Sequence, residues 1–308
     1  MTRLHLSHHY EHAIDLSYGE QPLFRYVFND DTDQYESPRP FFAPIHTLGG
    51  NLVSIYRPHD HLWHKGISMT LANLSGENFW GGPTYVHGQG YTPLPNNGSM
   101  RHDGWSKIEC SESQFSAVEE LTWITQAGAS WLQEVRSLAV PEVDEETGCW
   151  MLDYATELTN IHSEALIFGS PTTAGRPMAG YGGLFWRGPR SFSQGGRIWA
   201  EGGLEGDEIM GQPAAWLAYS GKHDGSGRRS TLLFMDHPEN PRYPTKWFMR
   251  NLPFACASFA FIFDEELPLQ PGATLGLRYR IAFWDGIPEP AQADRQVATW
   301  QQSAGTGA

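Results

Sequence analysis

The sequence predicts an all-β protein built from antiparallel sheets, with one short helix near its C-terminal end. The chain has 308 residues, and its 33 glycines, 21 prolines and 13% aromatic residues are typical of turn-rich β proteins. Strand-like segments recur between glycine, proline and asparagine turns, and no convincing helical periodicity precedes residue 288. We therefore expect a single β-sandwich domain over residues 1–287, then a helix and a disordered tail over residues 288–308.

Individual segments support this architecture in order along the chain. Two hairpins are expected, over residues 119–140 around the turn QAGA and over residues 215–236 around KHDGSG. The segment PAQADRQVATWQQS, from Pro290, predicts the helix. The last strand, TLGLRYRIAFW, alternates apolar and other residues, which predicts one buried face. That face would consist of Leu275, Leu277, Tyr279, Ile281 and Phe283.

Charge and composition exclude several classes of function. The net charge is −14 and the basic residues form no long cluster, so we expect no nucleic-acid partner. The N-terminus lacks the apolar core of a signal peptide, and no stretch approaches the roughly 18 apolar residues of a membrane span. We expect a cytoplasmic protein without a membrane partner. The cysteines, Cys110, Cys149 and Cys256, are too widely spaced to predict a disulfide framework or a zinc–cysteine site.

The stretch RPHDHLWHKGISM, residues 57–69, concentrates the residues that could do chemistry. In an extended chain the first two histidines share a face and the third points away, so convergence requires a turn, which Pro58 and Gly66 could frame. Such a HxHxxH spacing suits a divalent metal, a polar site where histidines move protons, or a solvated loop. No fourth ligand follows at a diagnostic spacing, so we expect a polar wall and no closed structural zinc site. The residues concerned are His59, His61, His64 and Lys65.

A second candidate lies on the predicted strand WLQEVRSLAV. Glu134 and Arg136 share one face with apolar neighbours. If that face is inward, the pair is buried, and a buried pair adds little stability, which favours an orienting or catalytic role. If it is outward, the two residues form an exposed cross-strand pair. Further candidates lie in segments rich in glycine or proline: Trp80, His87, Arg101, His102, Asp103, Tyr181, Arg187, His237, Asn240, Arg242 and Trp247.

The order of these segments resembles the PmoA-like family of unknown function over about residues 35–287. The resemblance rests on HDHLWHKGIS, FWGG, GSMRHDGW, LTWITQAGASWLQEVRSL, AGYGGLFWR, AAWLAYSG, MDHPENPRYPTKWFMR and PGATLGLRYRIAFWDG. The family's methane-oxygenase label is set aside, because the chain has no membrane span and nothing like a membrane copper site. The closing segment is also similar to the last strands of galactose-mutarotase-like domains, which implies a β-supersandwich acting on a sugar or an oxidised sugar derivative.

The resemblance and the residues together predict a carbohydrate-active enzyme that transfers protons by epimerisation, β-elimination or glycoside hydrolysis. The alternative is a carbohydrate-binding protein without turnover. A divalent metal is possible, no other cofactor is expected, and no oligomeric state is predicted. By analogy of fold, HxHxxH, His102 and Glu134 would line one pocket. The expected catalytic residues are His61, His64, Lys65, His102, Glu134 and His237, and the expected substrate-binding residues are His59, Trp80, Arg136, Tyr181, Arg187, Asn240 and Trp247.

Overall fold

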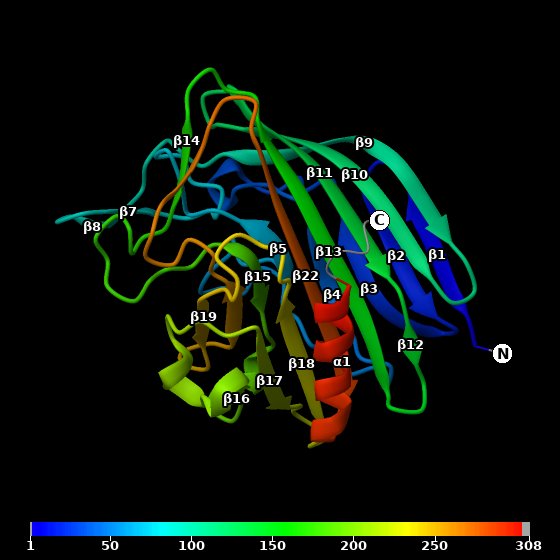
Figure 1. Cartoon of the computed structure of the whole chain (residues 1–308). Helices are drawn as coiled ribbons and strands as arrows, with labels where there is room; N and C mark the ends of the chain where they lie inside the picture. The colour runs from blue at the N-terminus through cyan, green and yellow to red at the C-terminus, as the bar shows by residue number, and fades with distance from the viewer. Residues whose placement is uncertain (1, 304–308) are drawn as a thin grey trace.

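The computed structural model describes residues 2–303 and shows two large sheets packed face to face (Figure 1). Within these residues the first sheet has eight strands. Each is hydrogen-bonded to the next in an antiparallel manner. In spatial order they are β1 (Leu4–His9), β2 (Ala13–Tyr18), β3 (Gln21–Val27), β4 (Phe41–Ile45), β5 (Ile67–Thr70), β15 (Gly183–Arg187), β20 (Cys256–Phe259) and β19 (Trp247–Arg250).

The second sheet, also antiparallel, has nine strands within the described residues. Both predicted hairpins belong to it, since β10 pairs with β11 and β17 with β18. The strands are β16 (Arg197–Ala200), β17 (Trp216–Lys222), β18 (Arg229–Asp236), β22 (Thr274–Asp285), β13 (Cys149–Asn160), β11 (Ser130–Val140), β10 (Phe115–Ile124) and β9 (Ser99–Cys110), with β12 (Val143–Asp144) against β13.

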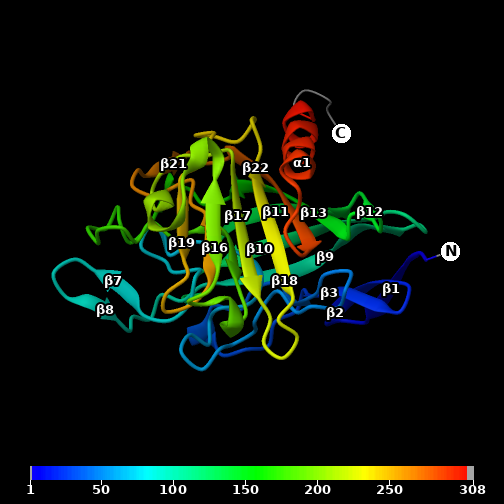
Figure 2. The same ribbon diagram turned by 90° about the horizontal axis from the view of Figure 1, so that it is seen from below.

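Smaller elements complete the chain. A short sheet of β21 (Leu267–Leu269), β14 (Leu166–Gly169) and β6 (Asn73–Leu74) lies at one end. The hairpin of β7 (Thr84–Val86) and β8 (Gly90–Thr92) projects from the end opposite the N-terminal strands (Figure 2). Single 3-10 turns are η1 (Gln34–Glu36), η2 (Arg190–Phe192), η3 (Glu201–Gly203) and η4 (Gly206–Ile209), and the one α-helix described is α1 (Pro290–Gln302).

The main core lies between the two large sheets and consists mostly of aromatic and branched aliphatic side chains. Phe24 of the first sheet meets Trp150 of the second at 6.0 Å between ring centroids, and Phe259 meets Tyr279 at 4.1 Å. The alternation predicted for the last strand is confirmed, because all five apolar residues from Leu275 to Phe283 are 7% exposed or less. Alternation with period two therefore gives each sheet one face for the core.

The C-terminal helix covers part of the outer face of the second sheet. Glu289 and Gln292 form a capping box at its start, and Trp300 packs into a small cluster with Met151 and Trp284. The predicted all-β antiparallel sandwich with a C-terminal helix is confirmed. Most of the tail expected to be disordered, SAGTGA, lies outside the described residues. Over residues 2–303 no helix combines the length and apolar character needed to cross a membrane.

Candidate functional site

A pocket of about 430 Å³ lies against the outer face of the first sheet. Its floor follows from alternation along β15, β19 and β20. Trp186 and Trp247 point into the core, whereas their neighbours Phe185 and Phe248 belong to a separate apolar cluster under the pocket. Arg250, two residues beyond Phe248, also faces the pocket. The sheet therefore offers an apolar floor with a cation at its edge.

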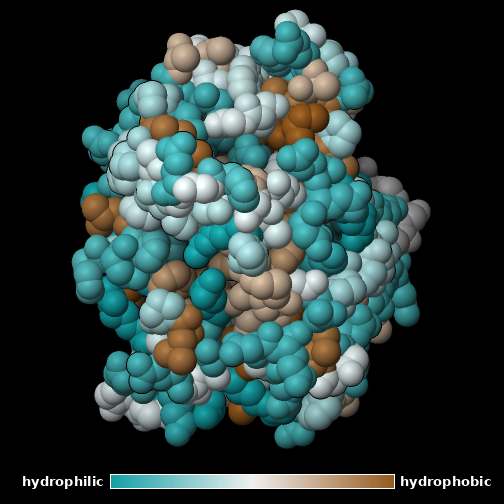
Figure 3. Space-filling view, turned by 90° about the vertical axis from the view of Figure 1, so that its left-hand side faces the viewer, coloured by the Kyte–Doolittle hydropathy of each residue, from teal (hydrophilic) through white to brown (hydrophobic). Residues whose placement is uncertain are grey.

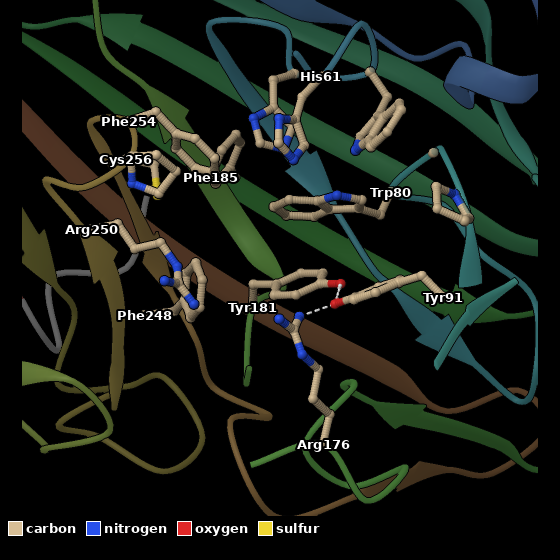
Figure 4. A pocket seen from close by; sticks show the side chains of 15 residues that line it. His61, Trp80, Tyr91, Arg176, Tyr181, Phe185, Phe248, Arg250, Phe254 and Cys256 are labelled. Carbon is tan, nitrogen blue, oxygen red and sulfur yellow. Dashed lines mark hydrogen bonds between the residues drawn. The ribbon is translucent and has the colours of Figure 1, made fainter. Parts of the chain in front are cut away.

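Aromatic side chains from loops form much of the wall. Trp80 and Tyr181 lie 4.5 Å apart between ring centroids, and both contribute to the pocket (Figure 4). Trp63 and Phe254 add further aromatic surface near the histidines. The rings of these residues give the pocket extended apolar faces of the kind that stack on a sugar ring.

The segment 57–65 turns before β5, as the histidine pattern requires. The backbone N–H of His61 donates to Pro58 at 2.9 Å, and that of His64 donates to His61 at 3.0 Å. Gly66 ends the turn at φ +47°, where a Cβ atom would lie 1.9 Å from the carbonyl oxygen of Phe42. Only glycine fits this position, because the left-handed backbone and the close approach both exclude a side chain. The turn brings His61 and His64 together, with ring centroids 4.6 Å apart.

His61 and Asp60 form an oriented pair at the mouth of the pocket. Nδ1 of His61 lies 3.1 Å from a carboxylate oxygen of Asp60, and the His61 side chain is 33% exposed. Burial lowers the pKa of His61 below its usual value, and Asp60 partly opposes this shift. The carboxylate itself stays ionised: burial would raise the pKa of Asp60, but hydrogen bonds from Arg187 and His61 hold it well below its usual range. Near neutral pH, His61 therefore donates Nδ1–H to Asp60 and keeps a lone pair on Nε2.

His64 presents the opposite hydrogen-bonding character. Its Nδ1 lies 2.7 Å from one terminal guanidinium nitrogen of Arg187, and the other terminal nitrogen of Arg187 bonds Asp60 at 2.9 Å. Arginine is always protonated here and can only donate, so Nδ1 of His64 accepts. Burial and the charge of Arg187 lower the pKa of His64 well below its usual value. The neutral ring carries its proton on Nε2, and among the described residues this atom has no hydrogen-bond partner.

The structure brings together some of the predicted site residues. His61, His64, Trp80 and Tyr181 line the pocket. Arg187 lies directly behind them, 1% exposed as a side chain. His59 lies at the outer edge of the same turn, where Nδ1 meets Arg190 at 2.9 Å, and it does not line the pocket.

Lys65 requires a correction, because it points away from the pocket. Its side chain is fully buried and bonds Asp30 and Thr32. Burial and the nearby charge of Arg39 lower the pKa of Lys65 to about 8, while Asp30 opposes the shift. The side chain that follows a histidine of the turn thus falls on the opposite side of the backbone, where it ties the turn to residues 30–32.

The expected single pocket with His102 and Glu134 is also corrected. These residues and Arg136 belong to a polar network inside the sandwich, which we call the core network: Tyr26, His102, Glu119, Trp123, Glu134, Arg136 and Thr156. Glu134 and Arg136 are each 1% exposed, so of the two orientations considered for their strand face the inward one holds. The strand β11 belongs to the second sheet, whereas the pocket lies on the outer face of the first. The core network therefore lies between the two sheets, and the pocket lies on the outer side of the first sheet.

The remaining predicted residues have structural partners elsewhere. His237 packs edge-on against Trp300, with ring centroids 4.9 Å apart. Asn240 bonds Asp236 and the backbone of Arg278, which fixes the turn after β18. Trp247 is fully buried and donates from its indole to the carbonyl of Ala214 at 2.9 Å.

Sequence reasoning missed four residues that matter at the pocket: Asp60, Arg176, Phe248 and Arg250. Two signals point to three of them, namely Asp60, Phe248 and Arg250. Asp60 stands between two of the histidines, where a carboxylate can orient a neighbouring imidazole. In KWFMR, alternation places Trp247 on one face of the strand and Phe248 and Arg250 on the other, and it is the second face that lines the pocket.

The three histidines of the HxHxxH stretch do not direct their Nδ1 atoms at a common point. The Nδ1 atom of each ring forms a hydrogen bond with a different partner: His59 with Arg190, His61 with Asp60 and His64 with Arg187. Two of those partners are cations, which would oppose a metal ion at the same nitrogen. Over the described part of the chain, no three histidine, cysteine or acidic side chains are grouped as metal ligands.

Comparison with known proteins places the chain in a family. The model of a family of unknown function, DUF6807, matches residues 13–298. The chain belongs to this family. Its description does not carry the PmoA-like label that the sequence resemblance suggested. No curated protein matches the chain in a sequence search.

Solved structures give low-scoring similarities. Galactose 1-epimerase from Lactobacillus acidophilus NCFM has a TM-score of 0.41 at 9% identity, covering 93% of this chain and 99% of that one. The aldose epimerase homologue from C. elegans has a TM-score of 0.35 at 8% identity, covering 94% and 100%. An α-galactosidase from Lactobacillus brevis scores 0.38 at 10% identity, with 92% of this chain matched to 39% of that one. At these scores the likeness carries no conclusion about chemistry.

Proposed function

We propose that the protein is an enzyme that transfers a proton on a sugar or an oxidised sugar derivative held in this pocket. The observation that carries the proposal is the pairing of two neutral imidazoles with opposite roles. The Asp60–His61 contact leaves a basic nitrogen on His61, and the Arg187–His64 contact leaves a proton on Nε2 of His64. A base beside a hydrogen-bond donor is the arrangement that acid–base catalysis needs.

The geometry favours proton removal next to a carbonyl group. Nε2 of His61 would take the proton from carbon, and the electron pair would move toward the carbonyl oxygen. Nε2–H of His64 would donate a hydrogen bond to that oxygen as its negative charge develops. Delivery of a proton from solvent to the other face of the carbon gives epimerisation, and loss of a neighbouring substituent, which leaves with the electron pair of its bond, gives β-elimination. Both outcomes use the same first step.

The lining supports a ring-shaped polar substrate. Trp80 and Tyr181 offer ring faces for stacking, and a volume of about 430 Å³ is within the range of small-molecule sites. Asp60 is held from three sides, by His61, Arg187 and Arg190, so the base keeps one orientation. Preorganisation of this kind lowers the barrier of the catalysed step.

Solvent exchange tests the proposal. Candidate aldoses, uronic acids and keto-glycosides would be incubated with the protein in D2O, and deuterium at the carbon next to the carbonyl would be followed by NMR. We expect exchange or turnover with a substrate, and a rate about 10²–10⁴-fold lower in His61→Gln. His5→Gln is the matched control, because His5 is an exposed residue of β1 outside the pocket.

The alternative function, carbohydrate binding without turnover, predicts another result. A sugar would then bind to the wild-type protein without any exchange or product. Equal rates in the wild type and in His61→Gln would also contradict the proposed role of His61.

A further inference from the structure

The charged side chains that line the pocket are all cations. Arg176 and Arg250 line it, together with two histidines, and no aspartate or glutamate is among the lining residues that the structure describes. This is unusual for a chain that carries 35 acidic and 21 basic residues. Elsewhere on the surface, Arg242 and Arg278 pair with glutamates. Within residues 2–303, neither Arg176 nor Arg250 forms an ion pair.

Aromatic rings hold both guanidinium groups in place without neutralising them. Arg250 lies over the ring of Phe248, 5.3 Å from its centroid, and Arg176 lies over Tyr91 at 4.7 Å. Arg176 also donates to the hydroxyl of Tyr91, which in turn meets Tyr181 at 2.8 Å between oxygens. Both arginines are partly buried, so their remaining donors are less hydrated than those of a free surface side chain.

We propose that the substrate of this pocket carries an anionic group, a carboxylate or a phosphate, which Arg176 and Arg250 bind. The inference rests on the proposed function for the substrate's sugar part and adds its charge. Guanidinium groups bind planar carboxylates and phosphates through paired hydrogen bonds, so two of them around one cavity form a strong anion site. A neutral sugar would leave both charges without a partner.

The anionic group lies away from the reacting atoms. Figure 4 shows both guanidinium groups on one side of Trp80 and His61 on the other. The arginines are therefore placed to bind a fixed charge on the substrate, whereas the oxygen that develops charge during reaction would lie near His64. Binding energy from this distant group would orient the ring against His61.

Arginine side-chain NMR tests the proposal without requiring turnover. The Nε–H signals of Arg176 and Arg250, assigned with Arg176→Gln and Arg250→Gln, would be followed during titration with four probes. The probes are D-glucuronate, D-glucose 6-phosphate, inorganic phosphate and D-glucose. We expect at least one anionic sugar to shift both signals, at a concentration about tenfold or more below that needed for glucose.

The arms of the titration separate the two sources of charge. A response to glucuronate alone identifies a carboxylate, and a response to the phosphate probes alone identifies a phosphate. In a calorimetric titration with the same probes, the double variant Arg176→Gln/Arg250→Gln should lose the preference for the anionic sugar, whereas Arg228→Gln, at the exposed β17–β18 turn, should keep it. The proposal is wrong if no anion shifts the signals more than glucose does at equal concentration. It is also wrong if the double variant keeps the preference.

This result is distinguishable from failure of the proposed function. His61→Gln should bind the anionic probe within about twofold of the wild type, because His61 lies on the other side of the pocket. Anion binding without any proton exchange would contradict the catalytic proposal alone. Exchange on neutral sugars without anion preference would contradict the charge proposal alone.

Discussion

The pocket and the core network both join histidine, arginine and carboxylate side chains, but they differ in what their hydrogen-bonding atoms face. In the core network, Glu134 accepts from Trp123, Arg136 and Thr156, and Glu119 accepts from Tyr26 and His102. In the pocket, Nε2 of His61, Nε2–H of His64 and two guanidinium groups border a cavity.

This difference shows which property identifies a candidate site. Burial is more complete in the core network, where Glu119, Glu134 and Arg136 are each 1% exposed or less. Yet their polar atoms form hydrogen bonds and ion pairs with one another, as buried ionic groups in a structural role require. The pocket has fewer internal partners and more atoms left for a ligand. Donors and acceptors that face a cavity, more than burial itself, therefore distinguish a site from a structural network.

The largest expected effect comes from removing the cation of the core network. Arg136→Met leaves Glu119 and Glu134 buried without their cationic partner, and we expect the free energy of unfolding to fall by about 3–5 kcal/mol. The same substitution at Arg250, which has no ion pair among the described residues, should change stability by about 0.5 kcal/mol or less. Urea denaturation of both variants measures this. Similar losses in the two would remove the distinction between the regions.

The next effect tests the register of β19. Trp247→Ala should destabilise the fold by about 3–5 kcal/mol, because it empties a fully buried site between the sheets. Phe248→Ala should cost less, about 1.5–3 kcal/mol, since the space it leaves joins an existing pocket. Only Phe248→Ala should weaken substrate binding strongly while most of the protein stays folded. Thermal unfolding and a binding titration compare them, and the reverse order of stability would contradict the assigned faces.

Sequence patterns predicted the fold better than the site, for a physical reason. Alternation from Leu275 to Phe283 reports burial directly, and turn residues mark hairpins, so local sequence is sufficient for strands. The turn at residues 57–65 was also predicted, because Gly66 and the histidine spacing are local. By contrast, the order of the strands in each sheet decides which loops and strand ends lie next to one another. His102 and Glu134 lie in the second sheet and His61 before β5 of the first, which no local pattern indicates.

A smaller effect concerns the pH dependence that the pocket gives to catalysis. His61 must be neutral to act as a base, and its pKa is lowered by burial, so kcat/KM should fall only below about pH 6.5. Asp60 raises the pKa of His61, so Asp60→Asn should move this acid limb to still lower pH. The maximum rate should fall by up to about 10²-fold, because the base loses its orientation. A pH–rate profile of both proteins checks the shift, and an unchanged limb would show that another group titrates.

The smallest expected effect comes from changing a tyrosine to phenylalanine, once in the core network and once at the pocket. Tyr26→Phe removes a hydroxyl that donates to Glu119 and accepts from Arg136 at 2.8 Å, both fully buried and charged. A hydrogen bond to a charged group contributes about 1.5–3 kcal/mol, and because Glu119 keeps His102 and Arg136 keeps Glu134 as partners, we expect a total loss within that range. Tyr91→Phe removes a hydroxyl that bonds Arg176 and Tyr181, but Tyr91 is 40% exposed and water can replace it. Its unfolding free energy should change by about 0.5 kcal/mol or less, while anion binding weakens slightly through a less ordered Arg176. Denaturation and the arginine NMR titration measure the two effects separately. A stability loss in Tyr91→Phe equal to that in Tyr26→Phe would mean that the pocket residues are structural after all.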